Sequence, residues 1–147
     1  MSADLTWLLV RGWNSFQRKS SNGPIFSAEQ GNLLNLHSQK YSGLANSKVL
    51  AIDANAEGAI TVTKIQPNGG QVASARKAST LKRSTGPRRA AKIAAVETAA
   101  KGYRADLRAA AVARISALTR VNRRAANPPK DKRSKKVAAE ENAIELD

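Results

Sequence analysis

The sequence predicts an α+β protein: a small N-terminal module with a β-hairpin or sheet and a short helix, followed by an extended basic arm with two α-helices. Five of the six aromatic residues lie within the first 41 residues, and the strand-like stretches lie before residue 70. From there on Ala, Lys and Arg dominate, a composition that favours helices. We therefore expect a module over residues 1–70 that holds the core, a basic helical arm over 71–129, and a disordered tail over 130–147 that begins basic and ends acidic.

The module begins with a short helix. Ser2 can accept a hydrogen bond as its N-cap, Asp4 falls in its first turn, and leucines follow at helical spacing at positions 5, 8 and 9. Gly12 ends this helix. The tryptophans of the region, Trp7 and Trp13, stand among apolar neighbours, so we expect both to anchor the core rather than to stack on nucleobases.

Strands are predicted at residues 15–20, 49–54 and 60–63. The first is followed by a turn at 21–24 that leads into a short apolar pair. The other two are rich in apolar and β-branched residues, and the segment between them, 55–58, holds Asn and Gly, which tolerate positive φ. These two strands should therefore form a hairpin.

Two helices are predicted in the arm. The first starts at Pro87, whose missing N–H costs nothing at the first helical position, and it continues through an Ala-rich stretch. Gly102 suits its C-terminal end, and a second helix begins near Tyr103 and stops before Pro128. The helices should follow one another directly.

The second helix has a narrow apolar stripe and arginines on most of its other sides. The stripe repeats at intervals of three and four residues, at Leu107, Ala111, Ile115 and Leu118. A helix docked on its own protein usually shows a broader apolar face. We therefore expect this helix to be surrounded by phosphate and to become ordered only against a polyanion.

Nearly all of the net charge of +14 comes from one segment. Residues 76–136 hold 19 Lys and Arg against three carboxylates, whereas the last eleven residues hold four carboxylates and no cation. A solvated helix pair held by ion pairs would need comparable numbers of both signs. Arginine outnumbers lysine in the segment by 11 to 8, which favours structured contact with phosphate groups.

Several classes of protein are disfavoured. The chain has no Cys and a single His, His37, which we take as a structural or surface residue, so it offers no familiar metal site. It lacks nucleotide-binding glycine motifs and a catalytic constellation, so we expect no enzyme, no cofactor and no small-molecule substrate. No apolar run approaches the roughly 18 residues of a membrane span, and we expect no membrane partner.

Three stretches resemble the eukaryotic large-subunit (cytosolic) ribosomal protein family numbered twenty-eight. They are residues 2–11 with Ser15 and Phe16, then 41–44 followed by Lys48, and then 103–108 followed by 114–118, in the order and at about the spacing of the family. The family has proline at the position of Ala105, and the acidic end of this chain is not among its features.

The resemblance implies a structural constituent of the large subunit that binds ribosomal RNA and adjoins other ribosomal proteins. It implies that the protein is assembled into the subunit in the nucleolus and is then located in cytosolic ribosomes. It also implies that the protein has no catalytic activity and no cofactor. We expect the RNA contacts to be basic residues of the arm: Arg76, Lys77, Lys82, Arg83, Arg88, Arg89, Lys92, Arg104, Arg108, Arg114, Arg120, Arg123 and Arg124. The run 130–136 is either a nuclear import signal or an RNA-touching tail.

Three alternatives stay open. One is a nucleolar assembly factor that shares the N-terminal module and leaves before the subunit matures. Another is a DNA-packaging protein of the linker-histone type, although such arms are richer in lysine than this one. The third, a membrane-active amphipathic helix, is disfavoured because the arm lacks Trp and Phe.

Overall fold

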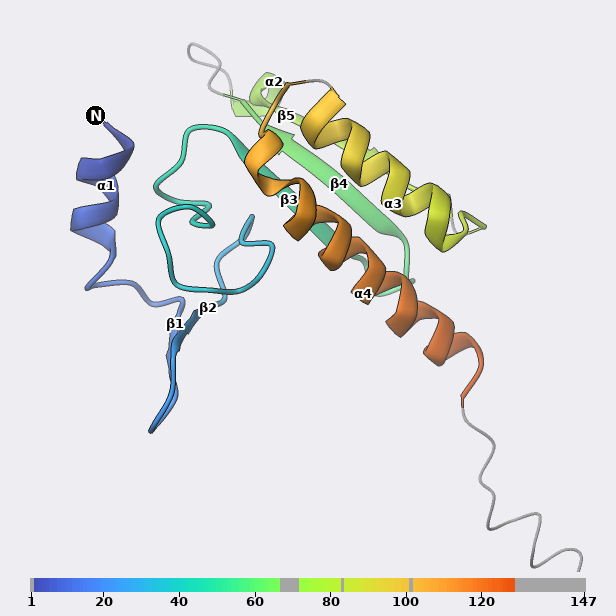
Figure 1. The fold of residues 1–147 in the computed structure, drawn as a ribbon, viewed down its shortest axis with the longest axis horizontal. Coiled ribbons are helices and arrows are strands. Elements are labelled where there is room, and N and C mark those ends of the chain that lie inside the picture. Colours follow the sequence, from blue (N-terminus) through green and yellow to red (C-terminus); the bar gives the residue numbers. More distant parts are fainter. Residues whose placement is uncertain (1, 67–71, 83, 101, 129–147) are drawn as a thin grey trace, which may run out of the picture.

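The computed structural model describes residues 2–66, 72–82, 84–100 and 102–128, shown in Figure 1. The α+β class is confirmed, with strands toward the N-terminus and helices toward the C-terminus. In chain order the elements are α1 (Ala3–Val10), β1 (Gln17–Lys19), β2 (Ile25–Ser27), β3 (Val49–Ala54), β4 (Ile60–Ile65), α2 (Val72–Ala75), β5 (Arg76–Thr80), α3 (Pro87–Ala95), the π-helical turn η1 (Val96–Ala100), the 3₁₀ turn η2 (Ala105–Leu107) and α4 (Arg108–Ala126). The expected tail, the run 130–136 and Arg83 lie outside the described residues.

Local sequence signals set most of the element boundaries. The Ser2 hydroxyl accepts a hydrogen bond from the Leu5 N–H at 3.3 Å and caps α1. Pro87 occupies the start of α3, as expected. Gly102 adopts a φ of +60°, which glycine reaches without strain, and so separates the two helical segments. Helix α4 ends at Ala126, just before Pro128.

The strands form two antiparallel sheets. Strands β1 and β2 make a hairpin, and the larger sheet has the order β3-β4-β5. The predicted hairpin of β3 and β4 is confirmed, with a register that runs from Val49 opposite Ile65 to Ala54 opposite Ile60. Strand β5 was not predicted, because its residues are exposed and show no apolar alternation. It pairs along the free edge of β4, with Thr80 opposite Thr61.

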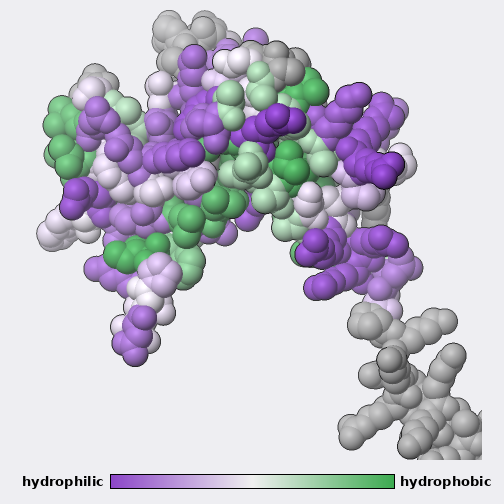
Figure 2. Space-filling view, viewed as in Figure 1, coloured by the Kyte–Doolittle hydropathy of each residue, from purple (hydrophilic) through white to green (hydrophobic). Residues whose placement is uncertain are grey.

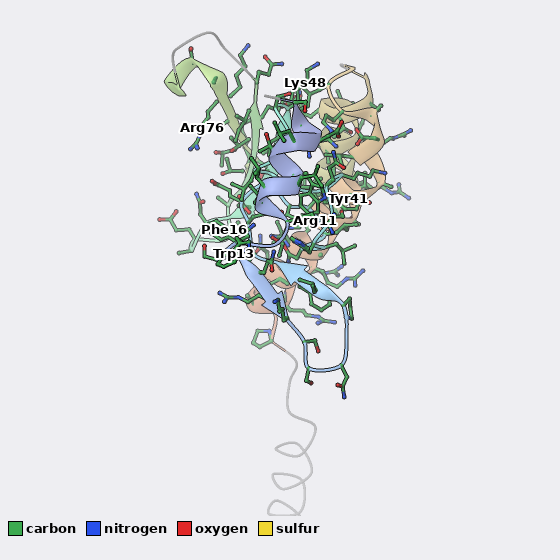
Figure 3. The ribbon with its side chains drawn as sticks, turned by 90° about the vertical axis from the view of Figure 1, so that its left-hand side faces the viewer. Arg11, Trp13, Phe16, Tyr41, Lys48 and Arg76 are labelled. Carbon is green, nitrogen blue, oxygen red and sulfur yellow. The ribbon has the colours of Figure 1, made fainter. Side chains whose placement is uncertain are left out.

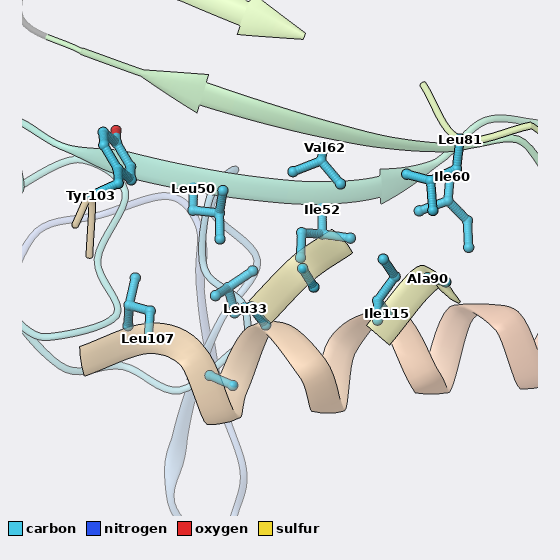
Figure 4. Packing of buried hydrophobic residues seen from close by; sticks show 13 residues of the cluster. Leu33, Leu50, Ile52, Ile60, Val62, Leu81, Ala90, Tyr103, Leu107 and Ile115 are labelled. Atoms are coloured by element: carbon cyan, nitrogen blue, oxygen red, sulfur yellow. The ribbon is translucent and has the colours of Figure 1, made fainter. Parts of the chain in front are cut away.

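The core lies between one face of the larger sheet and the helices α3 and α4, which lie side by side across it (Figure 1). The sheet contributes large aliphatic side chains, and the helices contribute mainly alanines (Figure 4). The buried residues of this core include Leu50, Ile52, Ile60, Val62, Leu81, Ala90, Ala94, Ala110, Ala111 and Ile115.

This packing changes two expectations about the helices. The stripe that seemed too narrow to hold α4 does dock it on the sheet, and Ile115 in that stripe is 0% exposed. The helices therefore pack on the sheet instead of extending from it, because the sheet supplies the large side chains that the Ala-rich helices lack. A boundary between module and arm near residue 70 would run through this core.

The expectation of an N-terminal core anchored by tryptophans was wrong. Trp13 is 93% exposed, and the buried cluster contains neither tryptophan. Trp7 is half-buried and packs on the ring of His37, with 4.9 Å between the ring centres. The His37 Nε2 also lies 2.9 Å from the carbonyl oxygen of Arg11, so of the two expected roles, structural or surface, His37 has a structural one.

Two glycines of the segment 28–48 lie so close to neighbouring residues that there is no room for a side chain. A Cβ on Gly31, whose φ is +86°, would lie 2.2 Å from the Val49 side chain. A Cβ on Gly43 would lie 2.0 Å from the carbonyl oxygen of Gln30. Beside them the buried Glu29 carboxylate accepts hydrogen bonds from the Ser42 hydroxyl and the Asn32 amide, at 3.1 and 3.2 Å. These contacts hold the backbone of a segment that has no regular helix or strand.

Candidate nucleic-acid interface

Six exposed cations gather at one end of the molecule. Helices α3 and α4 run in opposite directions, so the first turns of α3 lie beside the C-terminal half of α4 (Figure 1). Hydrophilic residues cover this end in Figure 2. We call this group the cationic end; its members are Arg88, Arg89, Lys92, Arg120, Arg123 and Arg124.

The start of α3 is electropositive for two reasons. Its N-cap residue is Gly86, which makes no side-chain hydrogen bond to the helix, and its first turn holds no acidic residue. The unpaired N–H groups there carry partial positive charge and favour anions. Arg88 and Arg89 add full positive charges at the same place. There they oppose the helix dipole, so their charges do not stabilise the helix. Such an end attracts phosphate strongly.

The outer side of α3 also carries a shallow hollow. It is lined by Arg88, Arg89 and Lys92 together with Ile93 and Val96. Glu97 borders it as well, but its carboxylate forms an ion pair with Lys64 of β4. The carboxylate at this border therefore has a cation of its own, and the three cations of α3 dominate the charge of the hollow.

The rotation of α4 directs its last arginines outward. Ile115 faces the core, and one turn beyond the stripe the Asn122 amide donates a hydrogen bond of 2.6 Å to the Gly58 carbonyl oxygen. With that side of the helix held against the β3–β4 turn, Arg120, Arg123 and Arg124 are exposed. Arg123 and Arg124 also lie in the last turn, where a cation interacts favourably with the helix dipole. Stabilisation of α4 is therefore one reason for arginines at these positions.

Two predicted RNA contacts are instead engaged within the protein. The Arg104 guanidinium donates to the carbonyl oxygens of Lys48 and Lys40, at 3.1 and 2.9 Å, and to both carboxylate oxygens of Asp106. Arg114 donates to the Ile52 carbonyl oxygen at 3.3 Å and lies 3.9 Å from Asp53. These arginines join α4 to the rest of the fold.

The pKa values of the two neighbours of Arg104, Asp106 and Tyr103, are shifted in opposite directions. The Arg104 hydrogen bonds to the Asp106 carboxylate lower the pKa of that group, against a smaller opposing effect of burial. Burial raises the pKa of the Tyr103 hydroxyl. That hydroxyl donates to the carbonyl oxygens of Val49, at 3.1 Å, and Ile65, so it bridges the paired ends of β3 and β4. Lys64 lies over the Tyr103 ring, 5.3 Å from its centre.

The other four predicted contacts among the described residues lie apart from the cationic end or near its edge. Arg76 and Lys77 begin strand β5 beside α2, away from the start of α3 (Figure 1), and their side chains point to opposite faces of the sheet. Lys82 is exposed in the connection from β5 to α3, and Arg108 is exposed at the start of α4. The structure thus brings together six of the thirteen predicted residues.

Other kinds of site find little support in the part of the chain that the structure describes. Across residues 2–66, 72–82, 84–100 and 102–128, no group of three or more His, Cys, Asp or Glu side chains is arranged to hold a metal ion. In the same residues, none of the helices has both the length and the apolar character that crossing a bilayer requires.

Comparison with known proteins gives consistent matches. The profile of the ribosomal L28e protein family matches residues 5–121. Over 115 residues the chain is 37% identical to the large ribosomal subunit protein eL28 of Dictyostelium discoideum, which covers 78% of this chain and 84% of that protein. The protein of the same name from Schizosaccharomyces pombe is 31% identical over 121 residues, or 80% of this chain and 90% of its own length. The protein of that name from Caenorhabditis elegans is 38% identical over 85 residues, which is 57% of this chain and 66% of its own length.

Proposed function

The chain belongs to the ribosomal L28e protein family, and from this we propose that it is a structural constituent of the cytosolic large ribosomal subunit that binds ribosomal RNA through its cationic end. The observation that carries the RNA contact is the grouping of six exposed cations from α3 and α4 on one end of the molecule. The names of the relatives support the ribosomal setting.

The proposed mechanism is neutralisation and fixing of phosphate. Each cation that meets a phosphate releases condensed counterions, and the arginine forks hold the backbone in a defined position. Contacts of this kind are made to backbone and sugar, with little discrimination between bases. Arg76, Lys77, Lys82 and Arg108 lie outside the cationic end and supply further contacts. Arg104 and Arg114 act as positioning residues, because they hold α4 at the angle that exposes the other arginines.

A pair of charge-matched variants tests the localisation of binding. One changes Arg120, Arg123 and Arg124 to Gln, and its control changes the exposed N-terminal cations Arg11, Arg18 and Lys19 to Gln. With large-subunit RNA in a filter-binding assay, the first should lower affinity and reduce the salt slope by about 3, since each phosphate contact accounts for about 1. The control should keep both. Equal losses in the two variants would mean diffuse attraction and contradict a localised interface.

A mature ribosomal constituent and an assembly factor differ in where they are found. Because a constituent stays after assembly, we expect the tagged full chain to sediment with translating polysomes on a sucrose gradient. Restriction to precursor particles would support the assembly factor instead.

A further inference from the structure

Helix α1 is apolar on two opposite sides. One side faces the protein, where Trp7 packs on His37 and the Gln39 amide donates to the Asp4 carboxylate at the start of the helix. The other side carries Leu5, Leu8 and Leu9, which are 48%, 60% and 63% exposed. A helix that is apolar all round is normally covered on all sides. The outward leucines therefore indicate a missing neighbour.

The exposed apolar surface continues past the end of the helix. Trp13, which is 93% exposed, lies just beyond the C-terminal end of α1, next to Phe16 (Figure 3). One of the hydrophobic patches in Figure 2 lies over α1, at the side of the molecule opposite the cationic end. Contiguous apolar surface of this kind marks interaction sites. An eight-residue helix also gains little stability by itself, so it depends on what packs against it.

The chemistry of this surface favours a protein over RNA. Three of its four side chains, Leu5, Leu8 and Leu9, are aliphatic: they offer no hydrogen-bond donor to phosphate and no flat ring to a nucleobase. Only Trp13, at the edge of the surface, has a ring and an N–H group. A second copy of the chain is disfavoured, since two molecules with a net charge of +14 repel one another. The cation beside the leucines, Arg11, is exposed at the C-terminal end of α1 and suits a carboxylate on the partner.

We propose that Leu5, Leu8, Leu9 and Trp13 form a docking surface for an amphipathic helix of another protein of the large subunit, with an acidic residue of that helix opposite Arg11. The inference rests on the proposed function, because it places the partner in the same particle. Residues spaced i, i+3 and i+4 form a ridge that fits the groove of a second helix. Trp13 supplies a large amphipathic ring at the edge of the contact.

The surface is too small to hold a free partner, so we expect the partner to belong to the same particle. Helix α1 is about 12 Å long, whereas a stable interface buries about 800 Å² on each partner. Such a small surface holds a partner only when both are already tethered nearby, which raises their effective concentration. The contact should therefore be detectable in assembled subunits and weak between isolated proteins.

Site-specific photocrosslinking in the assembled particle tests the proposal. The full chain carries p-benzoylphenylalanine in place of Leu9, or, as a control of matched exposure, in place of Val121 between the arginines of α4, which is 60% exposed. Purified large subunits are irradiated, and adducts are sorted by their sensitivity to ribonuclease and to protease. We expect a protein adduct from position 9 and an RNA adduct from position 121.

The outcomes separate this inference from the proposed function. An RNA adduct or no adduct from position 9, with the chain present in the subunits, overturns the docking surface alone. Absence of the chain from large subunits overturns both. As a second check, Leu8→Asp should abolish the protein adduct from position 9 and leave the adduct from position 121 unchanged, because Leu8 is 60% exposed and its change leaves the core intact. An undiminished protein adduct would contradict packing on the leucine ridge.

Discussion

Tyr103, Arg104 and Asp106 join the beginning of α4 to distant parts of the chain. The Tyr103 hydroxyl reaches the ends of β3 and β4, and the Arg104 guanidinium reaches backbone carbonyls at Lys40 and Lys48. Asp106 holds the guanidinium in place from the other side. At the scale of single residues, the motif that carries the family resemblance thus holds the fold together.

Removal of the Tyr103 hydroxyl should destabilise the protein. Tyr103→Phe leaves the ring in place but takes away the donor to the Val49 and Ile65 carbonyl oxygens, a loss worth about 1–2 kcal/mol in the free energy of unfolding. Urea denaturation measures it. Tyr41→Phe is the matched control, since within the described residues its hydroxyl makes no hydrogen bond, and it should change stability little. Equal effects of the two changes would contradict the bridging role.

The contribution of Asp106 should depend on pH. Its pKa in the folded protein is lowered, chiefly by the hydrogen bonds from Arg104, relative to about 3.9 in the unfolded chain. The stabilisation is therefore complete above about pH 4 and is lost as the pH falls through the folded-state pKa.

Urea midpoints of the parent and Asp106→Asn should differ at about pH 7, and the difference should narrow toward about pH 2, because protonation of the Asp106 carboxylate removes its charge. Glu57→Gln, at an exposed carboxylate in the β3–β4 turn that makes no ion pair among the described residues, is the charge-matched control. A gap of equal size at both pH values would show that the Asp106 carboxylate charge does not contribute.

At the scale of elements, alanine has two roles in α3 and α4. It favours the helical backbone, and it lets the two helices approach each other and the sheet closely, as the buried Ala90, Ala94, Ala110 and Ala111 show. The aliphatic residues of β3 and β4 fill the remaining space. Composition indicates the first role, but the second depends on which elements meet in space.

Ile115→Ala should be strongly destabilising, by about 2–5 kcal/mol, because this side chain is fully buried and its removal leaves a cavity between α4 and the sheet. Val121→Ala, six residues further along the same helix, is mostly exposed and should change the free energy of unfolding by no more than about 0.5 kcal/mol. Chemical denaturation of both variants makes the comparison. A mild effect at Ile115 would indicate that α4 is not docked on the sheet.

At the scale of the whole molecule, the cationic end and the leucines of α1 are separated. The cationic end lies where α3 begins and α4 ends, and the exposed leucines of α1 lie on the opposite side (Figure 2). One side is suited to phosphate and the other to a protein. A molecule of this kind can join RNA to a neighbouring protein within one particle.

Binding to ribosomal RNA should be highly sensitive to salt. If six to ten phosphates are contacted, affinity should fall by roughly 10³ to 10⁵ between about 50 and 200 mM salt, because released counterions drive the association. Filter binding across this range measures the slope. A flat response would contradict phosphate neutralisation as the source of affinity.

The sequence by itself determined the elements whose signals are local: the Ser2 cap of α1, the hairpin of β3 and β4, and the start of α3 at Pro87. It also contained the stretches by which the family is recognised. Only the tertiary structure decided which cations are exposed, since Arg104 finds its carbonyl partners 56 and 64 residues away along the chain. It likewise decided that α4 docks and that the leucines of α1 stay uncovered. Local signals depend on neighbouring residues, whereas burial and hydrogen-bond partners depend on elements that folding alone brings together.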